Sequence, residues 1–231
     1  TVDQVLPPLN EKDTTKLSVM LPLVSAALEN YVQPSPASPS GTSHDSIRAM
    51  AFDFADFAMA LDCHAESRTH AARCLHASIS RFTPRNGQLC PAKEILANQL
   101  MPCMKLSLDD ATNKRESVKN VARARFSDAI SLLGLLGSAA ACRGGPSART
   151  ADLIVQSLAD LACAKQTVSL FTEDAQDPIH LSLFDAGGPD ESTKLAVQSA
   201  EQLGSILSTE SGNLLWKQRL THIAAKRILE Y

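Results

Sequence analysis

Apolar residues recur at helical spacing along almost the whole chain, and this pattern constrains the fold more than any other feature. In the first such segment, Leu17, Leu21, Val24 and Leu28 fall on one face. A period of 3.6 residues predicts amphipathic helices, and stretches rich in proline, glycine and serine separate them. We expect eight helices, at about 14–33, 45–62, 66–82, 91–107, 113–143, 147–171, 191–208 and 212–230.

The composition supports a helical chain. Aromatic residues make up only 4% of the 231 residues, and runs of β-branched residues are few, which argues against a sheet of any size. By this count about two-thirds of the chain is helical, well above the usual third, and we predict an all-α fold. Loops are expected at 33–44 and 172–190, and the "IHLSLF" stretch in the second loop reads as either a short turn or a strand.

Three weak internal similarities suggest a repeat, and one of them is an acidic residue at the turn between paired helices, as at Asp62 and Asp109-Asp110. Leu21-Pro22-Leu23 and Met101-Pro102-Cys103 each place a proline inside an apolar helix, where it bends the axis. A basic residue is followed by apolar residues three, seven and eleven positions later in four segments, which begin at Arg48, Arg68, Lys119 and Lys217. Residues 96–137 combine these features and resemble a unit of the HEAT-repeat family of armadillo-like α-solenoids.

This resemblance implies a right-handed α-solenoid of about eight antiparallel helices in HEAT-like hairpins. A closed helical bundle is the alternative, because helices of these lengths fit either architecture. We expect a single helical domain over 1–231. Because Thr1 is not a methionine, the chain reads as trimmed or as a fragment of a longer solenoid.

Two cysteines and three histidines fall within fourteen positions, at Cys63, His64, His70, Cys74 and His76. A zinc site needs about four ligands that converge on one point. On a helix His70 and Cys74 share a face, whereas His76 lies about 120° or more away from both. We therefore interpret the cluster as a seam between packed helices, with a metal-dependent enzyme as the alternative.

No other pattern indicates catalysis. The chain lacks the GxSxG, P-loop, GxGxxG and HExxH motifs. Cys90 precedes a proline in a predicted loop, with no evident activating group. Glu66, Glu94 and Glu116 lie near helix starts, where a carboxylate complements the helix dipole. We predict a protein that is not an enzyme, with no catalytic residue, cofactor or metal ion.

The helix that begins near 113 carries a basic edge, made of Lys114, Arg115, Lys119, Arg123 and Arg125. The ordinary interpretation is a solvated face beside the core. The functional interpretation is a binding patch for an acidic segment of a partner protein, because second helices line the inner surface of HEAT arrays. We do not expect nucleic acid as a partner, since the net charge is −3 and only Phe126 is near for stacking.

The expected function is a non-enzymatic scaffold or adaptor that presents a helical-repeat surface to other proteins, and a compact bundle adaptor or cytoskeletal module is the alternative. Self-association, or a capping partner, is expected through apolar residues of the last helix: Leu214, Leu215, Trp216, Ile223 and Ile228. No membrane helix or leader is visible, and the six cysteines form no CxxC pair, so we expect a cytoplasmic or nuclear protein without a membrane partner. Proline-directed phosphorylation of Ser35 and Ser38 is a further hypothesis.

Overall fold

The structure is a computed structural model that describes most of the predicted helices. The described residues are 21–24, 26, 41–59, 65–81, 91–111, 113–143, 148–163, 168–170, 179–181, 189–209 and 214–230. The chain divides into two compact units, Thr1–Pro91 and Ala92–Tyr231. A single domain over 1–231 stays a prediction, and each unit is described by itself.

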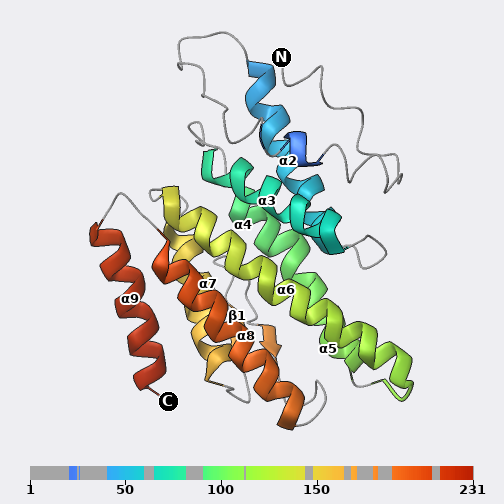
Figure 1. Cartoon of the computed structure of the whole chain (residues 1–231). Coiled ribbons are helices and arrows are strands. Elements are labelled where there is room, and N and C mark those ends of the chain that lie inside the picture. Colours follow the sequence, from blue (N-terminus) through green and yellow to red (C-terminus); the bar gives the residue numbers. More distant parts are fainter. Residues whose placement is uncertain are drawn as a thin grey trace. The chain divides into compact units, whose positions relative to one another are not determined.

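The first unit contains α2 (Gly41–Met59) and α3 (Ala65–Arg81), which pack against each other (Figure 1). Phe54 and Ala55 from α2, and Leu75 from α3, are fully buried. Helix α2 begins four residues before the predicted start, so the expected loop at 33–44 is wrong at its end. Ser40, directly before α2, is a residue type that favours helix N-caps.

A continuous helical segment opens the second unit. It runs through α4 (Pro91–Ile95), the π-helical turn η2 (Leu96–Leu100) and α5 (Met101–Ala111). The Met101 backbone N–H donates to the Leu96 carbonyl, five residues back. Pro102 follows at once and has no N–H to donate, and its ring crowds the carbonyl four residues earlier. The wider turn is one way in which a helix accommodates such a residue, consistent with the predicted bend.

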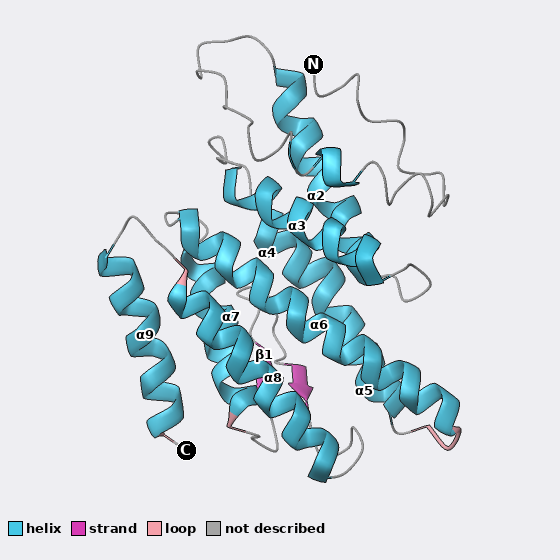
Figure 2. Ribbon diagram, in the orientation of Figure 1, coloured by secondary structure: helices cyan, strands magenta, loops and turns pink. Residues whose placement is uncertain are grey.

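Helix α6 (Glu116–Arg143) is the longest described helix and lies against α5, α7 and α8 (Figure 2). Before it, the Asn113 side-chain oxygen accepts a hydrogen bond from the Arg115 backbone N–H at 3.0 Å. The Arg115 carbonyl in turn accepts from the Lys119 N–H, so it starts the helix. The helix ends before Gly144-Gly145-Pro146, as the sequence predicts.

Helix α8 (Pro189–Ser208) runs parallel to α6 and close to it. Gln198 bonds Ser127 and Ser131 near the start of the contact, whereas Ile206 lies beside Gly137 further along both helices. The contacts therefore advance in the same direction on each helix, as the colours of Figure 1 show. The absence of a side chain at Gly137 allows this close approach.

Helices α7 (Ala148–Ala162) and α9 (Leu214–Leu229) form a second parallel pair. Arg219 bonds Asp152, and Arg227 bonds Gln156 one turn further along α7. Helix α7 also packs on α6 and α8, and its buried residues include Ile154 and Leu158. Two pairs of alternate helices, α6 with α8 and α7 with α9, therefore lie side by side and parallel.

Besides its helices, the second unit contains a short antiparallel pair of strands. Strand β1 (Val168–Leu170) pairs with β2 (Ile179–Leu181) in the register Val168↔Leu181 and Leu170↔Ile179. The helix predicted at 147–171 is therefore too long, because Val168 lies in a strand and its neighbourhood is rich in β-branched and aromatic residues. The loop expected at 172–190 likewise contains β2 and ends where Pro189 begins α8, since proline suits a first helical turn.

The all-α prediction is confirmed at the level of fold class, because the described residues are helical apart from this three-residue pair and short turns. The spacing of basic and apolar residues also identifies buried positions: Ala122, Phe126 and Ile130, which follow Lys119, are all buried. None of the helices within the described ranges is long and apolar enough to cross a membrane.

Candidate functional site

The predicted basic edge of α6 is not one patch. Lys114 and Arg115 lie in the turn before the helix and are exposed. Lys119 and Arg123 follow on one face of the helix, one turn apart. Arg125 is two residues beyond Arg123, and at 100° per residue it lies about 200° around the axis. The structure thus separates the five residues into three locations.

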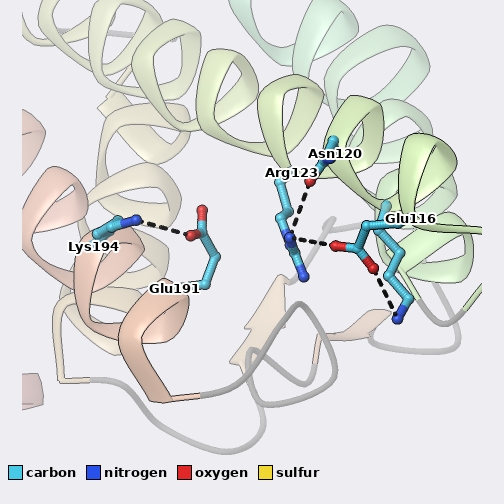
Figure 3. Close-up of polar contacts among 6 residues, drawn as sticks. Glu116, Asn120, Arg123, Glu191 and Lys194 are labelled. Atoms are coloured by element: carbon cyan, nitrogen blue, oxygen red, sulfur yellow. Dashed lines mark hydrogen bonds and ion pairs between the residues drawn. The ribbon is translucent and has the colours of Figure 1, made fainter.

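Glu116 occupies the centre of the second location. Its carboxylate accepts a hydrogen bond from Arg123 at 3.2 Å and forms an ion pair with Lys119 at 3.6 Å. Arg123 also donates to the Asn120 side-chain oxygen at 3.1 Å, and Figure 3 shows the guanidinium between these two acceptors. Lys119 and Arg123 are only partly exposed. One carboxylate therefore offsets part of the positive charge here, beside its expected role in the first helical turn.

Arg125 serves the packing of two helices. Its guanidinium donates to the Asp110 carboxylate of α5 at 3.3 Å, and both side chains are about one-third exposed or less. This ion pair joins the end of α5 to α6. The least compensated charges of the edge are therefore those of Lys114 and Arg115, for which the described residues provide no ion pair.

The cysteine and histidine cluster divides in a similar way. Cys74 is fully buried, and its thiol donates to the Leu21 carbonyl at 3.3 Å. His70 lies 4.0 Å from Glu66, one turn earlier on α3. His76 is partly buried, and this burial lowers the pKa of its imidazole below the ordinary 6.5. These contacts fit a helix seam, and no group of three possible metal ligands occurs among the residues that the structure describes.

Several predicted positions lie outside the described residues: Cys63, His64, Cys90, Ser35 and Ser38. On α9, the structure describes the backbone but not the side chains of Leu214 and Trp216. Leu215 is 76% exposed, Ile228 is 46% exposed, and Ile223 is half-buried. Leu229, the neighbour of Ile228, is 84% exposed.

A polar contact between α7 and α9, which the sequence did not reveal, is buried on the α7 side only. Asp152 of α7 is only 6% exposed, and its Oδ2 atom accepts from Arg219 Nη2 at 2.6 Å and from Nε at 3.1 Å. Gln156, one turn later, accepts from Arg227 Nη2 at 3.4 Å. A carboxylate beside Ala151 and Ile154 on a strongly apolar helix was the available signal, but its partner lies 67 residues away.

Burial also shifts three groups that the sequence did not single out. On α2, desolvation raises the pKa of Asp53, and both desolvation and the Asp53 charge raise the pKa of Asp56. On α5, burial raises the pKa of the Cys103 thiol, against the opposing effects of Arg125 and a hydrogen bond with Ser107. A raised thiol pKa keeps this cysteine protonated and weakly nucleophilic.

Comparison with other proteins gives no family: no family model matches the chain, and no curated protein or solved structure matches it significantly.

Proposed function

We propose that this chain is a non-enzymatic scaffold or adaptor that presents stacked helical hairpins to partner proteins. The observation that carries the proposal is the pairing of alternate helices, α6 with α8 and α7 with α9. Helices that stack in two parallel layers are typical of α-solenoids, whose units contact only their neighbours and expose long surfaces.

The packing of the last helix favours the stacked alternative over a closed bundle. In a closed four-helix bundle of α6 to α9, the first and last helices lie side by side. Here the described packing of α9 is with α7 and, to a smaller extent, with α8. The HEAT-like solenoid therefore remains our preferred architecture for the chain, and a cytoplasmic or nuclear location is part of the same proposal.

Lys114 and Arg115 are the residues that we assign to partner binding. They are exposed, close in sequence and held in a turn fixed by Asn113. An acidic segment of a partner protein would complement them. Lys119 and Arg123 are not part of this assignment, because they lie in a separate location where Glu116 offsets part of their charge.

The test is a double charge reversal, Lys114→Glu with Arg115→Glu. Proteins captured by the tagged full chain are identified, and the main partner is purified and titrated against the variant. Because exposed ion pairs contribute about 0.2–1 kcal/mol each, we expect binding to weaken by about tenfold and to become less sensitive to salt.

The matched control reverses two other exposed lysines of the same unit, Lys105→Glu with Lys194→Glu. It makes the same change in net charge away from the turn. Equal loss of affinity in the control, or full affinity in the Lys114 and Arg115 variant, contradicts the assignment of this site. Capture of no partner that can be reconstituted from purified components contradicts the scaffold function itself.

A further inference from the structure

Helix α9 lies on α7 through a small apolar contact between two polar ones. Its buried side chains, among those described, are Leu220 and Ala224, which are 2% and 3% exposed. Arg219 precedes them and bonds Asp152, and Arg227 follows them and bonds Gln156. The remainder of the described helix is largely solvent-exposed, including Leu215 and Leu229.

The face of α7 that lies under this contact is apolar, with an acidic residue at its N-terminal end. Asp152, Val155, Gln156 and Ala159 follow one another at intervals of three, one and three residues, so they share one face of the helix. Val155 and Ala159 are fully buried, and Asp152 is more than nine-tenths buried. We call these four residues the α7 seat.

Only one of the two carboxylate oxygens of Asp152 accepts hydrogen bonds from α9. Both Arg219 donors bond the same oxygen, Oδ2. The other oxygen, Oδ1, is inaccessible to solvent and has no hydrogen-bond partner within the part of the chain that the structure describes. A buried acceptor without a donor destabilises the folded state, whereas an arginine fork can bond both oxygens of a carboxylate. In its position on α9, Arg219 therefore leaves one hydrogen-bond acceptor of the α7 seat, Oδ1 of Asp152, without a donor.

We propose that the α7 seat is a docking site for an amphipathic helix of a partner protein that presents an arginine to Asp152, and that α9 is its exchangeable occupant. The charge of Asp152 selects the arginine. The pattern of α9 defines the rest of the partner helix: an apolar residue one position after the arginine and a small residue five positions after it. This inference rests on the proposed scaffold function for the existence of a partner.

The first experiment uses the full chain with α9 disabled by Arg219→Ala and Leu220→Asp. The probe is a fluorescent peptide with the sequence of residues 214–229, and its anisotropy reports binding. We expect saturable binding to the α9-disabled chain and at least tenfold weaker binding to the wild-type chain, where α9 competes. An added Asp152→Asn substitution should weaken binding at least tenfold, and so should a peptide whose arginine at position 219 is alanine.

Absence of peptide binding to an α9-disabled chain that keeps its circular dichroism spectrum overturns the proposal. Hydrogen exchange of the wild-type chain provides a test that does not depend on the variants. The proposal requires the amides of α9 to exchange through an opening of that helix alone, faster than those of α6 and α7. Exchange of α9 only together with the whole unit overturns it.

A third outcome concerns the identity of the occupant. If the wild-type chain dimerises in light scattering and Arg219→Ala abolishes the dimer, α9 of a second copy fills the seat, and the assignment to a partner protein is overturned. Failure of these tests leaves the proposed scaffold function in place, because that function is tested separately through Lys114 and Arg115.

Discussion

Three helical glycines of the second unit differ in what surrounds them. At Gly137 of α6, an added Cβ would collide with Ile206 of α8 and would lie 2.8 Å from Ile154 Cγ2 of α7. At Gly134 it would lie 2.7 Å from the Cβ of Gln202. At Gly204 of α8 an added Cβ would have no described side chain or other helix within 4 Å. The first two glycines therefore set the distance between helices, and the third has no such role within its unit.

We expect Gly137→Ala to destabilise the chain and Gly204→Ala to stabilise it. Overpacking of a close helix contact costs about 1–3 kcal/mol, which exceeds the gain in helix propensity. In open space only the propensity changes, by up to about 1 kcal/mol in favour of alanine. Urea denaturation measures both. An equal gain from the two substitutions would show that α6 and α8 do not approach each other at Gly137.

His76 predicts a dependence of stability on pH. Burial lowers its pKa below the ordinary 6.5, so the unfolded chain binds a proton at a pH where the folded chain does not. The contribution of His76 to the free energy of unfolding therefore falls as the pH drops below about 6.5, and it levels off below the folded pKa. We expect His76→Gln to flatten this part of the profile in urea titrations between pH 7.5 and 5. An unchanged slope in the variant contradicts the assignment.

At the scale of the element, the segment from α4 to α5 shows how a helix tolerates an internal proline. Pro102 is exposed, so its ring contributes little to the core. Leu96 and Leu100, which lie in the π turn before it, are buried, as are Met101 and Met104. The extra residue in the turn keeps both apolar ends of the segment buried although the regular hydrogen bonding is interrupted.

We expect Pro102→Ala to stabilise the chain by about 1–3 kcal/mol, because alanine restores a backbone donor and removes the steric conflict. Urea denaturation measures the change. Asn98→Ala, on the exposed side of the same segment, is the control for propensity alone and should gain only a few tenths of a kcal/mol. A loss of stability in the Pro102 variant would contradict this prediction. It would show that the packing around the π turn, and not the proline, is the reason why the π turn is present.

Gln198 shows how a single side chain fixes the register of two helices. Its amide nitrogen donates to the Ser127 carbonyl at 2.8 Å and to Ser131 Oγ at 2.9 Å, and its oxygen accepts from Ser127 Oγ at 2.9 Å. These bonds join α6 and α8 on the part-exposed side of their contact. The donors and acceptors match at one register only, so they complement the less directional apolar packing of Leu203 and Ile206.

At the scale of the whole molecule, the chain has two compact units, and the second contains two parallel pairs of alternate helices, α6 with α8 and α7 with α9. The architecture that we propose predicts which helices the last helix contacts. In a stack, α9 contacts α7 and stays apart from α6, whereas in a closed bundle it packs beside α6.

Photo-cross-linking tests this prediction in solution. A diazirine amino acid at position 220, which is buried in the contact with α7, should cross-link to residues of 148–163. Mass spectrometry of the digested chain identifies the linked peptides. The matched control places the same amino acid at the exposed position 218, where cross-links to α7 should be far fewer. Dominant links from position 220 to α6 would contradict the stack and favour the bundle.

The sequence by itself determined the helical class and much of the core, because the 3.6-residue period is a local property of the chain. Leu21 and Val24 were assigned to one apolar face from this period, and both are buried. The start of α4 at Pro91 and the end of α6 at Arg143 were likewise predictable, since proline and glycine act on their own backbone. The β1 and β2 pair was only half predicted, because strand pairing depends on a distant partner.

Only the tertiary structure decided which charges remain available. The basic edge read as one patch because its five residues are close in sequence. Asp110 lies on a neighbouring helix and bonds Arg125. The same holds for Asp152, whose partner Arg219 is 67 residues away. The bond between Glu116 and Arg123 is different, because it is local to α6. Ion pairs between helices depend on the packing that brings the two helices together, and no local pattern encodes it.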